Sequence, residues 1–507
     1  MGIRTFLKSL TSTSTHRRPT RRRPPVTRLR LEPLEDRIVL STFVVGNLDD
    51  SGPGSLREAV SAANSNPGAD LIRFAPAARA GVIALTSGEL AITDDLRIDG
   101  PGAGRLAVSG SEASRVFQIG SGAAVSIDDL TITRGRALLR GGGILNAGSL
   151  SLSRAVVSDN EVVGLPGFGA GVDPFGGGIL NTGVLTVDRT LFVHNRSTGA
   201  DGDLGGPGST ALGGAIMSLG SAAAPATATI SHSTFLDNQA VGGAAGEGAA
   251  FTRAGIGGAI MNDAGTMTIN HSLFRDNRAV GGAGGGFPGG FGAGGAIANV
   301  ALFGDAILSV SHSTLLNNQA IGGAAGPGTS PQIGKGGAIA NFIPGAAPLP
   351  VTVAAIAQIS ESVLVGNQAV GGSGDTGGTG QGGAITNETG GVLTVTSSLI
   401  ALNRATGGVG HGGNGGSGLG GGIFNGGPSP WGTPHLTLSR SIVVGNKAEG
   451  GAADGGSAGL GTGGGLYLAP GGIACADPLT VIVANDASTS DDDVFGILMF
   501  GMLGESC

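Results

Sequence analysis

Residues 257–277 read Gly-Gly-Ala-Ile-Met-Asn-Asp-Ala-Gly-Thr-Met-Thr-Ile-Asn-His-Ser-Leu-Phe-Arg-Asp-Asn. Short β-branched runs separated by Asp, Gly and Ser are typical of strands joined by tight turns. We predict strands over 257–262, 266–270 and 273–277, which make about one turn of a three-sided solenoid. Each coil would pair its strands with those of the next coil at a spacing of about 4.8 Å. The side chains expected to point inward are Ile260, Ile269 and Phe274.

Two short motifs of this stretch recur together along the chain. Gly-Gly followed by a small residue and Ile or Leu occurs nine times, and an apolar-x-x-Asn follows each of the first eight copies. A unit repeated every 20–50 residues indicates a stacked repeat architecture. The nine copies begin at Gly141, Gly176, Gly213, Gly257, Gly294, Gly336, Gly382, Gly420 and Gly463. The eight asparagines are Asn160, Asn195, Asn238, Asn277, Asn318, Asn367, Asn403 and Asn446.

Both motifs can be explained by folding alone. A stacked Asn can hydrogen-bond to the Asn of the coils above and below, which forms an amide ladder. The motif glycines allow either a positive φ at a corner or a close approach of two backbones. We therefore interpret the eight asparagines as structural repeat residues and not as a site.

Composition excludes several classes of protein. Glycine supplies 101 of the 507 residues, and charged residues supply only 13%. Collagen needs glycine at every third position, a period that this sequence lacks. Disordered chains combine low hydrophobicity with high net charge, whereas this chain is 40% hydrophobic with a net charge of −7. So much glycine also disfavours helices, which leaves an all-β fold.

Three segments resemble those of known families. The paired motifs, over about residues 141–466, resemble the GGA[ILV] and FxxN repeats of chlamydial-type polymorphic outer membrane proteins and of right-handed parallel β-helix surface proteins. Leu-Glu-Pro-Leu-Glu-Asp-Arg at 31–37 resembles the N-terminal motif of planctomycete extracellular and surface proteins. Ser-Leu-Arg-Glu-Ala at 55–59 resembles the segment that begins many bacterial surface β-helices. The resemblances imply a right-handed, single-stranded parallel β-helix with a pectin-lyase-like fold, located extracellularly or on the cell surface.

Four segments are expected from this pattern. We predict a basic export or targeting segment over 1–41 and an N-terminal cap over 42–81 with a short helix at 55–63. A β-helix of about a dozen coils with Gly-rich insertions extends over 82–496, and an apolar tail over 497–507. The insertions 165–175, 242–256, 281–293, 371–381 and 407–419 occupy one place in every repeat, so they are expected on one exposed face.

Charge and cysteine content limit the partners. The first 40 residues hold 10 of the 29 basic residues and 3 of the 36 acidic ones, so the rest carries 19 − 33 = −14. An acidic body argues against nucleic acid as a partner. The sequence also shows no transmembrane segment, and the apolar run near 494–503 is about half the length that spans a bilayer. Cys475 and Cys507 could form one disulfide, and the sequence leaves this open.

Isolated residues suggest chemistry without completing a site. His232, His271 and His312 fall at the same place in three coils, where a metal column or a solvated corner is possible, and the mixed residues of the other coils favour the corner. Gly410-His411-Gly412 is similar to a polygalacturonase motif, but it stands without the paired carboxylates that such an enzyme needs. Asp201, Asp203 and residues 491–493 could touch calcium. We expect no catalytic residue, no cofactor and no metal.

The sequence predicts a non-catalytic protein acting in adhesion or surface structure, with an unidentified protein or glycan ligand. No cluster of Asp, Lys or Arg on one face is apparent, which disfavours the alternative, a polysaccharide lyase or hydrolase. A third hypothesis is a self-assembling surface module.

Overall fold

The computed structural model describes residues 40–165, 172–203, 206–246, 253–284, 289–326, 328–329, 332–344 and 353–501. The chain divides into two units, Met1–Val39 and Leu40–Cys507, and all the described residues belong to the second. Most of the basic segment predicted over 1–41 and of the tail over 497–507 lies outside the described residues, as does Cys507.

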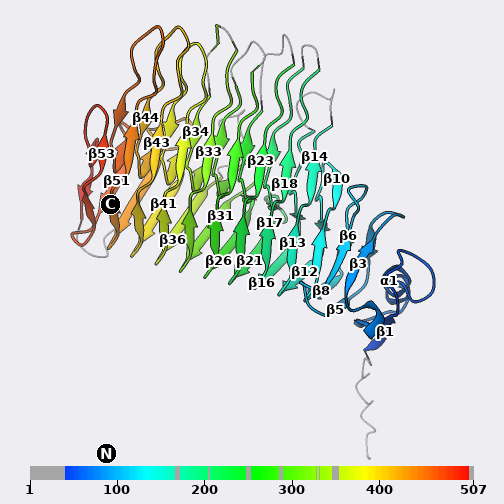
Figure 1. The fold of residues 1–507 in the computed structure, drawn as a ribbon. Helices are drawn as coiled ribbons and strands as arrows, with labels where there is room; N and C mark the ends of the chain where they lie inside the picture. Colours follow the sequence, from blue (N-terminus) through cyan, green and yellow to red (C-terminus); the bar gives the residue numbers. More distant parts are fainter. Residues whose placement is uncertain are drawn as a thin grey trace, which may run out of the picture. The chain divides into compact units, whose positions relative to one another are not determined.

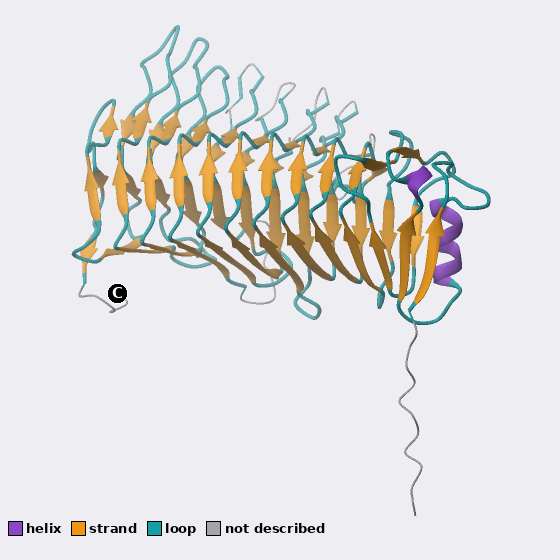
Figure 2. Cartoon of the chain, turned by 60° about the horizontal axis from the view of Figure 1, so that its bottom comes forward, coloured by secondary structure: helices purple, strands orange, loops and turns teal. Residues whose placement is uncertain are grey.

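The described chain is a parallel β-helix with one α-helix, α1 (Leu56–Asn64), and one short 3-10 turn, η1 (Pro76–Ala78) (Figures 1 and 2). Its strands form five sheets, A to E, in which every strand pairs in parallel with the corresponding strand of the neighbouring coils. The two 12-stranded sheets agree with the dozen coils predicted from the repeats.

Sheet A runs in the order β1 (Ser41–Val45), β2 (Asp70–Phe74), β5 (Leu96–Asp99), β8 (Ala124–Asp128), β12 (Ser149–Ser153), β16 (Val184–Asp188), β21 (Ala226–Ser231), β26 (Gly265–Asn270), β31 (Ala306–Ser311), β36 (Ala355–Ser360), β41 (Val392–Thr396), β46 (His435–Ser439), β51 (Ile473–Ala476) and β55 (Met499–Phe500). Sheet B runs β3 (Gly81–Ala84), β6 (Leu106–Ser109), β9 (Thr131–Thr133), β13 (Val156–Ser158), β17 (Leu191–Val193), β22 (Thr234–Leu236), β27 (Leu273–Arg275), β32 (Thr314–Leu316), β37 (Val363–Val365), β42 (Leu399–Ala401), β47 (Ile442–Val444) and β52 (Val481–Val483).

Sheet C runs β4 (Leu90–Ile92), β7 (Phe117–Ile119), β11 (Ile144–Asn146), β15 (Ile179–Asn181), β20 (Ile216–Leu219), β25 (Ile260–Asp263), β30 (Ile297–Val300), β35 (Ile339–Phe342), β40 (Ile385–Glu388), β45 (Ile423–Asn425), β50 (Leu466–Leu468) and β54 (Val494–Phe495). Sheet D runs β10 (Arg136–Leu138), β14 (Glu161–Val163), β18 (Arg196–Thr198), β23 (Gln239–Val241), β28 (Arg278–Val280), β33 (Gln319–Ile321), β38 (Gln368–Val370), β43 (Arg404–Thr406), β48 (Lys447–Glu449) and β53 (Asp486–Ala487). Sheet E runs β19 (Ala211–Leu212), β24 (Gly255–Ile256), β29 (Gly292–Ala293), β34 (Gly334–Lys335), β39 (Gly380–Gln381), β44 (Gly418–Leu419) and β49 (Gly461–Thr462).

One coil passes through sheets C, A, B and D, leaves in a Gly-rich insertion and returns through sheet E. The three-sided coil predicted from residues 257–277 is therefore incomplete, because two further strands flank each insertion. The predicted inward residues Ile260, Ile269 and Phe274 are all fully buried. Along the axis, Phe274 stacks on Phe235 with ring centroids 4.6 Å apart, and Phe235 stacks on Phe192 at 4.7 Å, so an aromatic column spans three coils of the core.

The two motif glycines have different roles. The first adopts a left-handed backbone, with φ of +68° at Gly257, which most residues with a side chain avoid. The second packs against the next coil, because a Cβ on Gly258 would lie 2.1 Å from the carbonyl oxygen of Gly295. The sequence predicts a positive φ or a close backbone approach as the reason for the motif glycines. The first reason applies to the first glycine and the second reason to the second.

The cap helix α1 begins one residue later than predicted and ends at Asn64. Ser55 is its N-cap and accepts from the Glu58 amide at 3.2 Å, while the Glu58 carboxylate accepts from the Gly54 amide. This pattern resembles a capping box, for which Ser-Leu-Arg-Glu is the expected sequence, except that the Glu58 carboxylate accepts from the residue before the N-cap. The helix packs on β1 and β4 and so covers the first coil (Figure 2).

The Gly-rich insertions are more ordered at their bases than the sequence indicates. The segments predicted as insertions over 242–256, 281–293, 371–381 and 407–419 end in strands of sheet E, which corrects their expected bounds. For 165–175, residues 166–171 lie outside the described residues, and Phe175 bridges to Leu212. Figure 2 shows the described parts of these loops on one side of the solenoid.

Glycine packing explains this order. The outgoing and returning limbs of successive insertions form one hydrogen-bonded zigzag along the axis: Gly416 donates to Gly408 at 2.9 Å, and Gly451 donates to Gly416 at 2.8 Å. A Cβ on Gly408 would lie 1.9 Å from the carbonyl oxygen of Gly372. Glycine is required at these positions because the backbones of neighbouring insertions are in contact. The bases of the insertions are therefore buried, and the predicted exposure holds only for the tips of the described loops.

Candidate functional site

The eight predicted asparagines form a continuous ladder between sheets B and D. All eight are fully buried. Each carboxamide nitrogen donates to the carboxamide oxygen of the next coil's Asn at 2.8–3.0 Å. The ladder continues beyond the predicted set, from Asn446 to Asn485 and then to the carboxylate of Asp493, both at 2.9 Å.

A second ladder of asparagines was not predicted from the sequence. Asn262 donates to Asn299 at 2.9 Å, and Asn299 donates to Asn341 at 2.8 Å. The sequence did contain the signal for this second ladder, because Asn recurs two residues after the motif Ile in most copies. This ladder consists of Asn146, Asn181, Asn262, Asn299, Asn341, Asn387 and Asn425, with Ser218 in one coil.

The histidine column lies at the corner between sheets A and B. The rings of His232, His271 and His312 stack with centroids 5.2 and 4.8 Å apart. His232 Nδ1 lies 3.2 Å from Asp188 Oδ1, and His312 Nε2 lies 2.7 Å from Glu361 Oε2. Among the residues that the structure describes, no group of three His, Cys, Asp or Glu could hold a metal ion.

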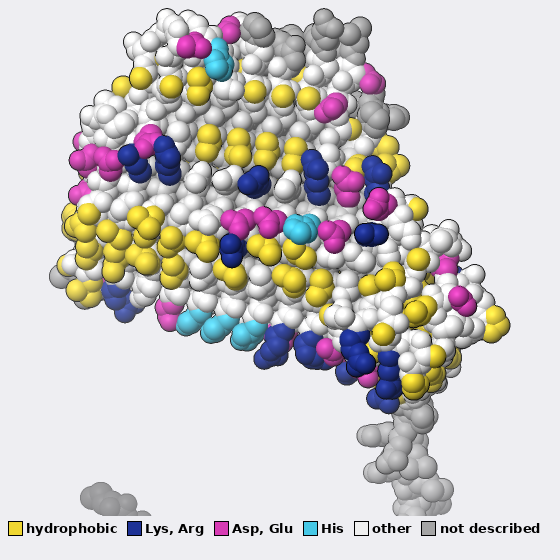
Figure 3. All heavy atoms as spheres, viewed as in Figure 1, with side chains coloured by type: hydrophobic (Ala, Val, Ile, Leu, Met, Phe, Trp, Pro, Cys, Tyr) yellow, Lys and Arg dark blue, Asp and Glu magenta, His cyan; other side chains and the backbone are white. Residues whose placement is uncertain are grey.

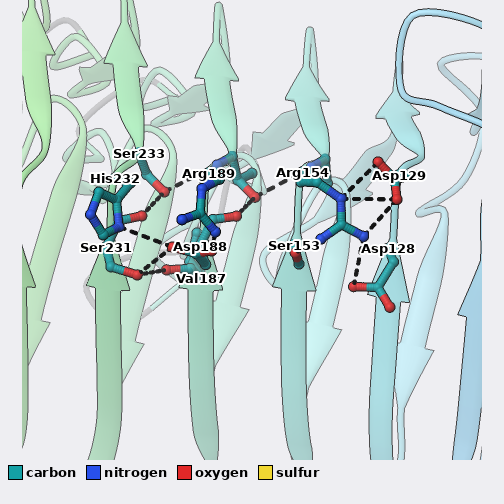
Figure 4. A network of polar contacts seen from close by, with 12 residues as sticks. Asp128, Asp129, Ser153, Arg154, Val187, Asp188, Arg189, Ser231, His232 and Ser233 are labelled. Atoms are coloured by element: carbon teal, nitrogen blue, oxygen red, sulfur yellow. Dashed lines mark hydrogen bonds and ion pairs between the residues drawn. The ribbon is translucent and has the colours of Figure 1, made fainter.

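The same corner continues into a network of ion pairs in the neighbouring coils (Figure 4). Arg154 donates to both carboxylate oxygens of Asp129, and this hydrogen bonding raises the pKa of the guanidinium. Partial burial would raise the pKa of Asp188, but hydrogen bonds from Ser231 and His232 and the charge of Arg189 outweigh it and lower that pKa. The polar side chains of this corner therefore form ion pairs and hydrogen bonds with one another.

His411 and the calcium candidates belong to surface turns. His411 Nδ1 lies 3.1 Å from Asp454 of the next insertion, and its hydrogen bond lowers the pKa of that carboxyl. One carboxylate, not a pair, faces this imidazole among the described contacts. Asp201 accepts from the Ala244 amide at 2.8 Å, and Asp492 accepts from the Ala487 amide at 3.0 Å, so both serve as backbone caps.

The structure does bring charged residues together at one place, contrary to the expectation that no such cluster exists. A groove of about 440 Å³ lies along the N-terminal coils at the junction of sheets B and D. It is lined by Glu112, Arg134, Gly135, Arg136, Asp159, Asn160, Glu161, His194 and Arg196. Asp159 and His194 each directly precede a repeat Asn, so the repeat itself places them in one column, whereas Arg134 precedes Gly135 in a coil that lacks the motif.

Two columns of residues build the groove. On sheet D, the register aligns Arg136 with Glu161 and Glu161 with Arg196. At the adjoining corner, Arg134, Asp159 and His194 adopt left-handed backbones with φ of +49°, +53° and +56°, which carry their side chains away from the buried Asn ladder. Successive coils therefore present ionisable groups side by side at the spacing of a parallel sheet.

Some of these charges are paired and others are not. Arg136 Nε lies 3.4 Å from Glu161, and His194 Nδ1 lies 3.5 Å from Asp159. Arg134 and Arg196 are exposed and form no ion pair within the described part of the chain. The side chains of His194 and Asp159 are 59% and 52% exposed. The groove can offer hydrogen bonds and guanidinium groups to a polar ligand while remaining open to water.

Comparisons with known proteins return solved structures at low identity only. No protein-family model and no curated protein matches this chain. A mannuronic-acid-specific polysaccharide family 6 lyase from the human gut microbiota is 10% identical over 91% of both chains, with a TM-score of 0.35. PfbA, a surface adhesin of Streptococcus pneumoniae, is 10% identical over 84% of this chain and 90% of its own, with a TM-score of 0.29. The A-module of the Azotobacter vinelandii mannuronan C-5 epimerase AlgE6 is 11% identical over 90% and 99%, with a TM-score of 0.23. None of these likenesses bears on function at such scores.

No helix of the described residues is long and apolar enough to cross a membrane.

Proposed function

We propose that this protein is a non-catalytic, extracellular or cell-surface binding protein that acts in adhesion or surface structure through the groove at Arg134, His194 and Arg196. The observation that carries the proposal is a groove lined almost entirely by ionisable side chains. Polar and guanidinium groups of this kind suit hydroxyl-rich or acidic ligands such as glycan chains, since Arg donates in a planar fork. The surface location rests on the resemblance of residues 31–37 and 55–59 to segments of exported proteins.

Exposure favours binding over catalysis. Catalytic acids and bases act in sites that exclude water, where a low dielectric strengthens each electrostatic interaction. The side chains of His194, Asp159 and Arg136 are each more than half exposed. The repeated asparagines, which could have formed an extended site, are buried in hydrogen-bonded ladders and offer nothing to a ligand.

The binding test uses the full chain on an array of neutral and acidic glycans. Arg134→Glu and Arg196→Glu are expected to reduce binding at least tenfold. Arg278→Glu is the matched control, since Arg278 occupies the same column of sheet D two coils further on, outside the groove. Equal binding by all three variants would refute the groove as the ligand site, and no binding to any glycan would direct the search to protein ligands.

A polysaccharide lyase or hydrolase is the second candidate, and the pairing of His194 with Asp159 between unpaired arginines favours it. A lyase needs a base near the sugar and a positive group that neutralises the substrate carboxylate. Pectin and alginate incubated with the full chain should yield no unsaturated ends or new reducing ends. Product formation that is lost in His194→Gln would establish the enzyme and overturn the non-catalytic proposal.

A further inference from the structure

The outer face of sheet B is apolar over seven consecutive coils. Each strand from β17 to β47 points its middle residue into the core and its two outer residues toward solvent. Of the fourteen outer residues, all but Thr234, Thr314 and Arg275 are apolar. The others are Leu191, Val193, Leu236, Leu273, Leu316, Val363, Val365, Leu399, Ala401, Ile442 and Val444, and all except Ala401 are at least partly exposed.

The neighbouring sheet shows that this composition is not a requirement of the fold. On sheet A, the central outward residues of the same coils are Thr186, Thr229, Thr268, Ser309, Gln358, Thr394 and Thr437, as expected of a sheet that faces water. Contiguous exposed apolar surface marks an interaction site. Figure 3 shows the hydrophobic side chains of sheet B gathered between two rims of different charge.

The two rims differ in charge in the second and third coils of the face, where His232 and His271 lie on the rim shared with sheet A, and Asp237 and Asp276 lie on the rim shared with sheet D. Over the seven coils the first rim carries Arg189, His232, His271, His312, Glu361, Ser397 and Arg440, and the second carries His194, Asp237, Asp276, Asn317, Gly366, Leu402 and Gly445. All these residues have a left-handed backbone at a corner. Arg275, the one charged residue of the face in these coils, pairs with Asp276 at 2.9 Å.

We infer that sheet B docks on sheet B of a second copy of this chain, in parallel, about a two-fold axis along the solenoid. In that arrangement each rim faces the opposite rim of the other copy at the same coil. His232 and His271 of one copy then meet Asp237 and Asp276 of the other, and the reverse contacts repeat by symmetry. The antiparallel arrangement, centred on the same seven coils, instead sets each rim against itself and places Asp276 of one copy opposite Gly366 of the other.

The size of the face suits such a pair. Seven coils at about 4.8 Å and five residues at about 3.3 Å give about 34 by 17 Å, or about 1,100 Å² buried in total between two copies. That area lies just below the range of stable specific interfaces, as expected of a weak pair, and exceeds what crystal contacts usually bury. The inference goes beyond the groove and does not depend on its ligand.

Sedimentation of the full chain tests this pairing. We expect a dimer at twice the 49.1 kDa of the chain. Leu316→Lys should yield the monomer, because it places one lysine from each copy in the apolar dimer interface. Ile307→Lys is the matched control, since Ile307 is 38% exposed on the outer face of sheet A and should leave the dimer intact. A wild-type monomer at high micromolar concentration would overturn the pairing, as would equal association of both variants.

A charge exchange distinguishes the parallel arrangement. His271→Asp alone should weaken association at least tenfold by placing two acids together at each rim. The double variant His271→Asp with Asp276→His should restore association, because the two rims merely exchange residues between the copies. Failure of the double variant to recover, with an unchanged melting temperature, would rule out the parallel two-fold pair.

Discussion

The carboxamide nitrogen of Asn277 lies 2.9 Å from the carboxamide oxygen of Asn318 in the next coil, and both side chains are fully buried. The Asn277 oxygen also accepts from the side chain and the backbone amide of Asn238, each at 3.0 Å. One side chain thus satisfies polar groups of two coils. Since every coil repeats the arrangement, the ladder ties each coil to its neighbours.

Replacement of Asn277 by Ala should lower the free energy of unfolding by about 1–3 kcal/mol, because buried donors and acceptors on both sides lose their partner. Asn414→Ala is the control, since Asn414 is exposed in an insertion. Thermal melts of the two variants measure the difference. Equal shifts would contradict a stabilising role for the ladder.

The glycine zigzag predicts an intolerance to the smallest side chain. Gly408→Ala should destabilise the protein by about 1–3 kcal/mol, because its Cβ would overlap the Gly372 carbonyl and the limbs would have to separate. Gly104→Ala, where a Cβ would meet nothing within 4 Å, should be neutral. Limited proteolysis would report the same effect as faster cleavage of the insertion that contains residue 408.

Asp263 predicts an unusual dependence of stability on pH. Burial raises the pKa of Asp263 to about 6, although the backbone amides of Leu302 and Phe303 donate to one of its oxygens and lower it. The other oxygen is buried without a hydrogen-bond partner in the described part of the chain. Because the folded pKa exceeds the unfolded value, the stability that this group contributes is complete below pH 4. It is lost as the pH rises through 6.

Asp263→Asn should therefore be more stable than the wild type at pH 7, by the order of 2 to 3 kcal/mol, and the advantage should vanish below pH 4. Denaturant unfolding at a series of pH values measures this difference. An advantage that is constant across the range would show that the carboxyl does not titrate in this window.

Leu402 is an apolar residue in an unsuitable backbone conformation. Its φ is +56°, and its side chain is 66% exposed, so it gains little from burial. Other coils place Asp237, Asn317 or Gly445 at the same corner. Leu402→Asn should stabilise the protein by about 0.5–1 kcal/mol, because Asn tolerates the left-handed region better. Leu399→Asn, in the extended strand of the same coil, should show no such gain.

The repeats allowed most of the fold to be predicted. A residue that recurs at one phase of a stacked coil must meet its own copies above and below, so Asn277 and Gly257 predicted both the coil and the residues that hold it together. The capping helix was equally predictable from Ser55 and Glu58, whose interaction is local. Sheets D and E escaped prediction because their strands are only two or three residues long, too short to show the alternating pattern that marks a strand, and those of sheet E are also rich in glycine.

The sequence by itself determined a stacked, glycine-rich, all-β architecture, since its repeated motifs specify which backbones touch and which amides pair. Only the tertiary structure decided where the isolated charges meet. Asp159 and His194 each directly precede a repeat Asn, but Arg134 precedes Gly135 in a coil that lacks the motif, and stacking places all three on successive coils of one groove. The rims of sheet B arise in the same way, because the position of each coil above the last is set by strand pairing and not by distance along the chain.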